Sequence, residues 1–172
     1  MTEHTISGDL TRKLEAALAQ KKPWMLGGLA HTFNVTEKEV ALALPAGMCA
    51  FTSGSSFTKV WEGLVSWEKA TFIMQHGGHV VEVSGRIPPG SFGHGFYNLR
   101  EGQELGGHIR ADAVSEMAFL SMPFMGLESH SVQFFDAGGC VVFSVYAGRE
   151  NHRIIPSVKA SFLSMKKELA DR

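Results

Sequence analysis

The chain contains 172 residues, 44% of them hydrophobic and 19% charged, and it carries a formal net charge of −1. This composition predicts a folded domain with its own core, and the near-zero charge gives no general attraction to nucleic acid or anionic lipid. The first residues lack the apolar segment of a signal peptide, and no run approaches the roughly 18 apolar residues of a membrane span. We therefore expect a cytoplasmic protein with no membrane insertion and no bound nucleic acid.

The amino-terminal part, residues 1–66, is predicted to be mainly helical. In its first segment, Ser7–Lys22, leucine and alanine recur at helical spacing, which makes one face of the helix apolar. Ser7 or Asp9 is placed to cap this helix, and Pro23 ends it because proline cannot continue a helix.

Residues 24–45 predict two further short helices, each with an apolar stripe. Thr36 and Glu39 form the pattern of a capping box at the start of the second one. Residues 46–56 are rich in glycine, serine and alanine, a composition typical of a loop. Apolar residues then recur at helical spacing over 57–65 and predict another helix.

The pattern changes at Trp67. Short runs rich in β-branched and aromatic residues, separated by glycine and proline turn signals, predict an antiparallel sheet of about six strands over residues 67–147. The runs are ATFIM, HVVEVSGRI, FYNL, VSEMAFLSM, HSVQFF and CVVFSVY, and the last two form a clear hairpin around DAGG. Residues 156–170 predict a carboxy-terminal helix. The expected fold class is α+β, with all 172 residues in a single domain.

A helix-turn-helix reading of residues 24–45 is one alternative. Ala30, Val35 and Val40 lie near the positions where that motif needs a small residue, a turn and a packing residue. A DNA-reading helix should begin with basic or amide side chains, whereas this one begins Thr-Glu-Lys-Glu. We therefore expect these helices to pack against the sheet, and a DNA-binding regulator remains an alternative.

The stretch 75–110 concentrates the candidate ligand residues. It places four of the eight histidines among glycines: His76, His79, His94 and His108. Neutral imidazole is the commonest protein ligand for transition metals and also binds haem iron. His108 has the strongest context, because two glycines before it leave backbone clearance and Ile109 and Arg110 after it offer an apolar contact and a carboxylate partner.

Patterns of known catalytic sites are missing. The sequence contains no HExxH or HxH metal motif, no GxSxG elbow and no phosphate-binding or dinucleotide fingerprint. No acid–base constellation is assembled either, so the residues give no support for an enzyme.

Several co-linear segments resemble the HutX/ChuX family of haem-utilisation carriers. They are LAHTFNVTEKEVALALP, FTKVWEGLVSW, VVEVSGRIPPGSFGHGFYNLR, GGHIR and FMGLESHSVQFFDAGGCVVFSVYAGRENHR, and the resemblance spans about residues 24–165. It implies a HemS/ChuX-like fold, in which the whole chain is one haem-binding domain. It also implies a homodimer that mimics the two-copy HemS/ChuS proteins, with haem donor and acceptor proteins as further partners in iron acquisition.

The resemblance also implies the iron ligands. The family histidine of the GHI segment falls on His108. A second family histidine falls on the Gln75 column, one residue before His76. A slip of one residue in a strand points a side chain to the opposite face. The second ligand is therefore His76, His79 or neither.

The sequence thus predicts a carrier or storage protein that takes up imported haem and hands it to a downstream acceptor. His108, with His76, would bind the iron above an apolar sheet face, and Arg100 and Arg110 are candidates for the haem propionates. The alternative function is a haem-modifying or haem-degrading enzyme, as the relatives of the family suggest.

Overall fold

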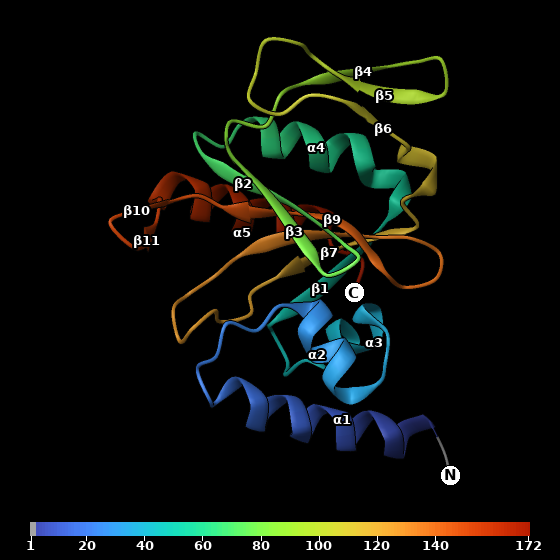
Figure 1. The fold of residues 1–172 in the computed structure, drawn as a ribbon, viewed down its shortest axis with the longest axis vertical. Coiled ribbons are helices and arrows are strands. Elements are labelled where there is room, and N and C mark those ends of the chain that lie inside the picture. The colour runs from blue at the N-terminus through green and yellow to red at the C-terminus, as the bar shows by residue number, and fades with distance from the viewer. Residues whose placement is uncertain (1–2) are drawn as a thin grey trace.

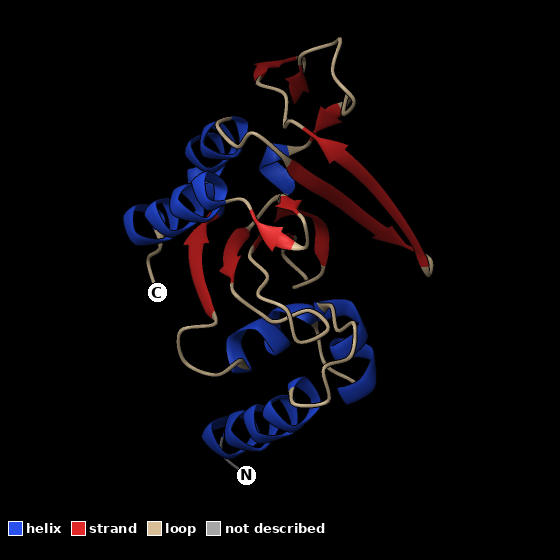
Figure 2. Ribbon diagram, turned by 90° about the vertical axis from the view of Figure 1, so that its left-hand side faces the viewer, coloured by secondary structure: helices blue, strands red, loops and turns tan. Residues whose placement is uncertain are grey.

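The computed structural model describes residues 3–172, with side chains from residue 8 onward. Its centre is a six-stranded antiparallel sheet that separates two groups of helices (Figure 1). The first three helices cover one face of the sheet. The other two helices and a small three-stranded sheet cover the opposite face (Figures 1 and 2). The expected α+β fold is confirmed.

The helices are close to those that the sequence predicts, except at the start of the chain. The first begins at Glu3, so Ser7 and Asp9 lie inside it and do not cap it as expected. Asp9 instead accepts hydrogen bonds along the helix surface from Arg12 and Lys13. Within the described residues no helix is long and apolar enough to cross a membrane. The bounds are α1 Glu3–Leu18, α2 Leu26–Phe33, α3 Glu37–Ala43, α4 Phe57–Val65 and α5 Pro156–Leu169, with 3₁₀ turns at Gly54–Ser56 and Ala111–Ala113.

The large sheet has the strand order β1-β7-β8-β9-β2-β3. A second sheet joins β4, β5 and β6, and a short ribbon joins β10 and β11. Sheet members are β1 Cys49–Ser53, β2 Ala70–His76, β3 His79–Gly85, β7 Glu116–Leu120, β8 Ser131–Phe135 and β9 Val141–Ala147. The small sheet and ribbon are β4 Gly90–Gly93, β5 Phe96–Leu99, β6 His108–Ile109, β10 Arg149–Glu150 and β11 Arg153–Ile154.

Two sequence predictions about the strands are wrong. Residues 46–56, expected to be a loop, contain the edge strand β1, which pairs with β7 along its length. The chain's end also holds β1, because Phe51 N donates to Arg172 O at 2.7 Å and Phe51 O accepts from Asp171 N at 2.8 Å. The FYNL run belongs to the small sheet and not to the main one. The pairing of β1 with β7 joins distant segments, which local composition does not reveal. FYNL pairs with its chain neighbours β4 and β6, and its local pattern does not show which sheet it joins.

An aromatic core joins the main sheet to α4 and to the small sheet. Trp61 of α4 is fully buried and its ring lies 6.2 Å from those of Phe134 and Phe143. Its Nε1 donates to Pro88 O at 2.9 Å. Tyr97 of β5 stands 6.0 Å from the same indole ring. Aromatic pairs at these separations add attraction beyond their buried area, so the small sheet is held firmly over this face.

The opposite face packs against α1, α2 and α3 through buried leucine, valine and alanine side chains. The capping box is confirmed: Glu39 N donates to Thr36 Oγ1 at 3.1 Å, and Thr36 N to Glu39 Oε2 at 2.6 Å. Glu37 accepts from Val141 N of β9 at 2.5 Å, so the first turn of α3 is docked on the sheet. The helices of residues 24–45 therefore pack against the sheet, as expected.

Leu64 and Leu163 test whether the aromatic core carries the stability of the fold. Leu64 is fully buried in α4, whereas Leu163 is 46% exposed on α5. We expect Leu64→Ala to lower the free energy of unfolding by about 2–5 kcal/mol, because it leaves a cavity. The matched change Leu163→Ala should cost about 0.5 kcal/mol or less. Urea denaturation of both variants measures this, and equal losses would contradict the described core.

Candidate functional site

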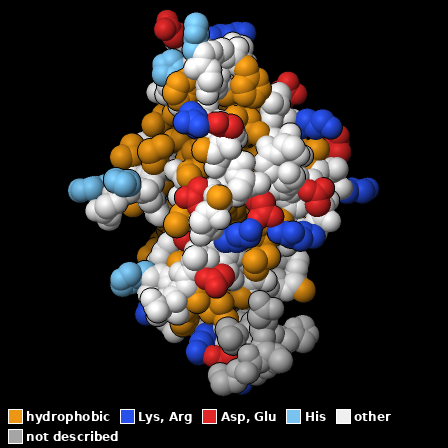
Figure 3. Space-filling model, turned by 90° about the vertical axis from the view of Figure 1, so that its right-hand side faces the viewer, with side chains coloured by type: hydrophobic (Ala, Val, Ile, Leu, Met, Phe, Trp, Pro, Cys, Tyr) orange, Lys and Arg blue, Asp and Glu red, His pale blue; other side chains and the backbone are white. Residues whose placement is uncertain are grey.

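A groove of about 340 Å³ lies between the main sheet and β6. Phe72 and Met74 of β2 and Phe143 of β9 line one side, and His108 and Ile109 of β6 line the other. On the face shown in Figure 3, histidine side chains gather at the top and at a projecting tip on the left, with hydrophobic side chains between them. The remaining lining is mostly apolar: Leu99, Leu105, Gly106, Gly107, Arg110, Ala113, Val114 and Val142.

An irregularity in β9 widens the apolar wall of this groove. Phe143 pairs with Phe134 and Val141 with Phe135, so Val142 has no partner in the register and forms a bulge. Neighbouring residues of a regular strand point to opposite faces, but a bulge re-aims one of them. Val142 and Phe143 consequently both line the groove.

His108 stands exposed at the edge of the groove with one ring nitrogen engaged. It lies directly opposite Asn98 in the β5–β6 pairing, and its Nδ1 is 2.6 Å from Asn98 Oδ1. The amide orientation follows from its other bonds, since Asn98 Nδ2 donates to Gly93 O at 3.0 Å. Oδ1 must then accept, so in the neutral ring His108 Nδ1 carries the proton and Nε2 keeps a free lone pair. A partner of this kind orients a metal-binding imidazole.

The glycines before His108 leave the clearance that the sequence predicts. A Cβ atom built on Gly106 or Gly107 would meet nothing within 4 Å. Gly107 also has a φ of +135°, in a region that side chains other than glycine rarely adopt. A flat ligand could therefore approach the backbone next to the imidazole.

The two candidate arginines differ in position. Arg110 lines the groove, but its guanidinium binds Asp112 through two hydrogen bonds of 2.8 Å. This hydrogen-bonded pair raises the pKa of Arg110 and lowers that of Asp112. Both side chains are exposed, so the pair is open to exchange with another carboxylate. Arg100 is exposed and does not line the groove.

His76 shares a strand face with the groove. Alternation along β2 puts His76 on the same side as Phe72 and Met74. Gln75 points to the other side, where its Nε2 lies 3.2 Å from Met25 Sδ. His76 itself is exposed at the end of β2, and the lining of the groove stops before it. The structure thus brings His108 and Arg110 together, and leaves His76 and Arg100 outside the lining.

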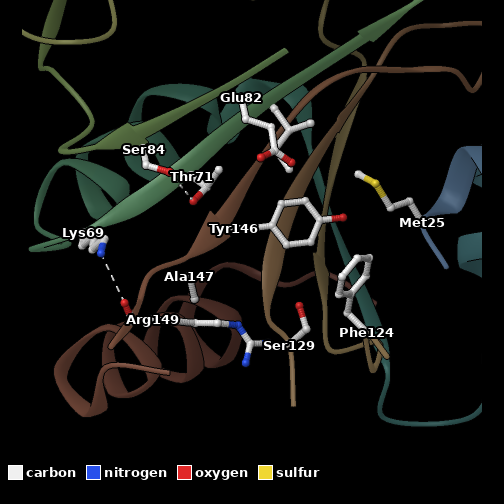
Figure 4. A pocket seen from close by; sticks show the side chains of 11 residues that line it. Met25, Lys69, Thr71, Glu82, Ser84, Phe124, Ser129, Tyr146, Ala147 and Arg149 are labelled. Atoms are coloured by element: carbon white, nitrogen blue, oxygen red, sulfur yellow. Dashed lines mark hydrogen bonds between the residues drawn. The ribbon is translucent and has the colours of Figure 1, made fainter. Parts of the chain in front are cut away.

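A second pocket of about 310 Å³ lies on the opposite face of β2 and β9 (Figure 4). Tyr146 projects into it, and burial raises the pKa of its phenol. Lys69 Nζ donates to Arg149 O at 3.3 Å, and the Arg149 guanidinium donates to the main-chain oxygens of His152 and Glu128. Both cationic side chains of this pocket, Lys69 and Arg149, are therefore already hydrogen-bonded to carbonyl oxygens. The other lining residues are Met25, Thr71, Ile73, Glu82, Ser84, Phe124, Ser129 and Ala147.

Sequence reasoning missed three residues around these sites. Asn98 and Asp112 control His108 and Arg110, and Tyr146 dominates the second pocket. Asp112 could have been found from its position two residues after Arg110. Asn98 could not, because its contact with His108 depends on the β5–β6 register.

Comparison with known proteins gives consistent matches. The family model described as haem utilisation ChuX/HutX matches residues 50–165. The intracellular heme transport protein HutX of Vibrio cholerae is 39% identical over 157 residues, which cover 89% of this chain and 81% of that protein.

Solved structures agree with these matches. The heme-binding protein ChuX superposes with a TM-score of 0.78 at 28% identity, over 90% of this chain and 97% of that one. The heme-degrading enzyme ChuS of Escherichia coli O157:H7 has a TM-score of 0.71 at 15% identity, so the likeness is one of fold. It covers 87% of this chain but 46% of ChuS.

The ring tautomer of His108 can be tested by substitution of its partner. We expect ¹⁵N NMR of the wild type, at a pH where the ring is neutral, to show the proton on Nδ1. In Asn98→Ala the acceptor is lost, and the spectrum should shift to a mixture of the two tautomers. The ring of His130, which contacts Ser121 and Glu128 instead, serves as an internal control and should not change. An unchanged His108 tautomer would contradict the orienting role of Asn98.

Proposed function

The chain belongs to the haem-utilisation ChuX/HutX family, and we propose that it binds haem in the cytoplasm and carries it to an acceptor protein. Two relatives support this proposal: HutX is named as an intracellular heme transport protein and ChuX as a heme-binding protein. The single observation that carries it is the apolar groove with the free Nε2 of His108 at its edge.

The residues of the groove fit haem as cargo. The macrocycle needs an apolar wall, and Phe72, Met74 and Phe143 supply one. The iron needs an imidazole nitrogen, and Nε2 of His108 is free to bind it. The open space beside Gly106 and Gly107 leaves room for a flat molecule next to this ligand.

His76 is the proposed second ligand, because it lies on the groove face of β2. Its place at the exposed end of the strand suits a ligand that is released when haem is passed on. Arg110 and Arg100 are proposed to pair with the propionates. For Arg110 a propionate would replace Asp112, a carboxylate of the same chemistry at an exposed site.

We also propose that the protein works as a homodimer joined at β3. The two edges of the main sheet differ: the carboxy-terminal residues bond to β1, whereas β3 has no partner strand on its outer side within residues 3–172. Val80 and Val81 of β3 are 52% and 60% exposed. A long, apolar, unpaired edge is a template for pairing with another chain. The fold also accounts for less than half of ChuS, which leaves room there for a second unit.

A hemin titration followed by absorbance tests the haem site. We expect saturable binding of one haem per chain to the wild type. His108→Ala should weaken binding by about tenfold or more, because changes in the outer shell alone cost metal sites roughly 10–100-fold. His76→Ala should also weaken binding, and the exposed His31→Ala, on α2, should not.

Adding a reductant to the haem-loaded protein distinguishes a haem carrier from a haem-degrading enzyme. A carrier keeps its haem spectrum, whereas loss of the porphyrin absorbance would favour a haem-degrading activity. Equal hemin affinity in wild type and His108→Ala would overturn the proposed ligand.

The proposed dimer is tested by sedimentation velocity. We expect the wild type to sediment at twice the mass of one chain. Val81→Lys places a charge on the β3 edge and should yield the monomer. Leu163→Lys places the same charge on the exposed face of α5 and should leave the dimer intact. A monomeric wild type, or dissociation by Leu163→Lys alone, would contradict pairing at β3.

A further inference from the structure

The hairpin of β2 and β3 ends in two histidines that face each other. His76 closes β2, His79 opens β3, and the two are direct partners in the register. Gly77 and Gly78 form the connection with φ of +57° and +82°, the positive values that a tight two-residue hairpin turn requires. Directly opposite residues point to the same face, with Cβ atoms about 4.5–5.5 Å apart. Both imidazoles therefore rise side by side from the tip.

Neither ring has a structural role. Both side chains are exposed, and in the described part of the chain neither ring takes part in a hydrogen bond, an ion pair or an aromatic contact. His108 and His130 differ, because their ring nitrogens contact Asn98, Ser121 and Glu128. The nitrogens of the hairpin pair are thus available to an external ligand.

We propose that His76 and His79 together bind one divalent transition-metal ion, with Cu²⁺ preferred over Ni²⁺ and Zn²⁺. Imidazole is a favoured ligand of all three ions, and affinity for a given nitrogen site rises to a maximum at Cu²⁺. Across the described residues no group of three or more histidine, cysteine or acidic side chains could hold a metal ion. The site is therefore a two-imidazole chelate, with water completing the coordination.

The site stands independently of the haem proposal, because it needs only the geometry of the hairpin tip. One consequence does rest on the proposed haem site: a metal ion at the tip would occupy His76 and compete with haem for it. The test below is made without haem, so failure of the metal site and failure of the haem site give separate results.

The experiment is a Cu²⁺ titration of untagged, haem-free protein, followed by calorimetry and by electron paramagnetic resonance. All proteins carry His4→Ala and Cys140→Ser, which remove a histidine near the amino terminus and an exposed thiol as competing ligands. The comparison uses His76→Ala, His79→Ala, the double variant, and His94→Ala. His94 is the matched control, since it is an exposed histidine in the turn of the β4–β5 hairpin without a histidine opposite it.

A chelate predicts non-additive losses. One Cu²⁺ should bind with two equatorial nitrogens. Either single substitution should weaken Cu²⁺ binding about tenfold or more. The double variant should bind only slightly more weakly than the single variant with the lower affinity. His94→Ala should bind like the background protein. Two independent sites, each removed by its own substitution with the other unaffected, would overturn the proposal. The same holds if no ion binds, or if His94→Ala has the larger effect.

Discussion

Tyr97 attaches the small three-stranded sheet to α4, which packs on the main sheet, and the position of His108 depends on that attachment. The Tyr97 ring packs edge-on against Phe57 and Trp61, at 5.3 and 6.0 Å, and its hydroxyl accepts from Gly90 N at 3.1 Å. The strand that carries His108 is two residues long and, among residues 3–172, pairs with β5 alone. So short a strand has little stability of its own, and its place is set by the anchored neighbour. The groove exists because this contact with α4 holds the small sheet over one face of the main sheet.

The period of two along β2 gives the molecule two different faces. Phe72, Met74 and His76 point to the side of the groove, whereas Thr71 and Gln75 point to the side of the helices α1–α3 and the second pocket. The groove face is apolar, with imidazole at its margin. On the other face the second pocket mixes polar and apolar residues, and its cations Lys69 and Arg149 are already bonded to carbonyl oxygens. This asymmetry favours the groove over the second pocket as the proposed haem site. Gln75 and His76 point to opposite faces of β2. A ligand residue moved from position 75 to position 76 would therefore point into the groove side instead of the helix side.

Much of the fold follows from the sequence, because helical and alternating periodicity is a local property. The helices α2–α5, the capping box of Thr36 and Glu39, and the β8–β9 hairpin are all of this kind. Strand β1 could not be predicted, because the glycine-, serine- and alanine-rich composition around it is typical of a loop. Its hydrogen-bond partners lie far away in the sequence, in β7 and at Arg172. At the site, the glycines before His108 correctly predicted open space beside its imidazole. The contact with Asn98 was not predictable, since it depends on how β5 and β6 align.

The central claim is that haem lies in the groove with its iron bound to His108. A crystal structure of the haem complex tests it most directly. We expect the iron on Nε2 of His108, at about 2 Å as in other metal–imidazole bonds, with the macrocycle against Phe72 and Phe143. Iron bound instead to Tyr146 in the pocket on the opposite face, or to no residue of the groove, would contradict it.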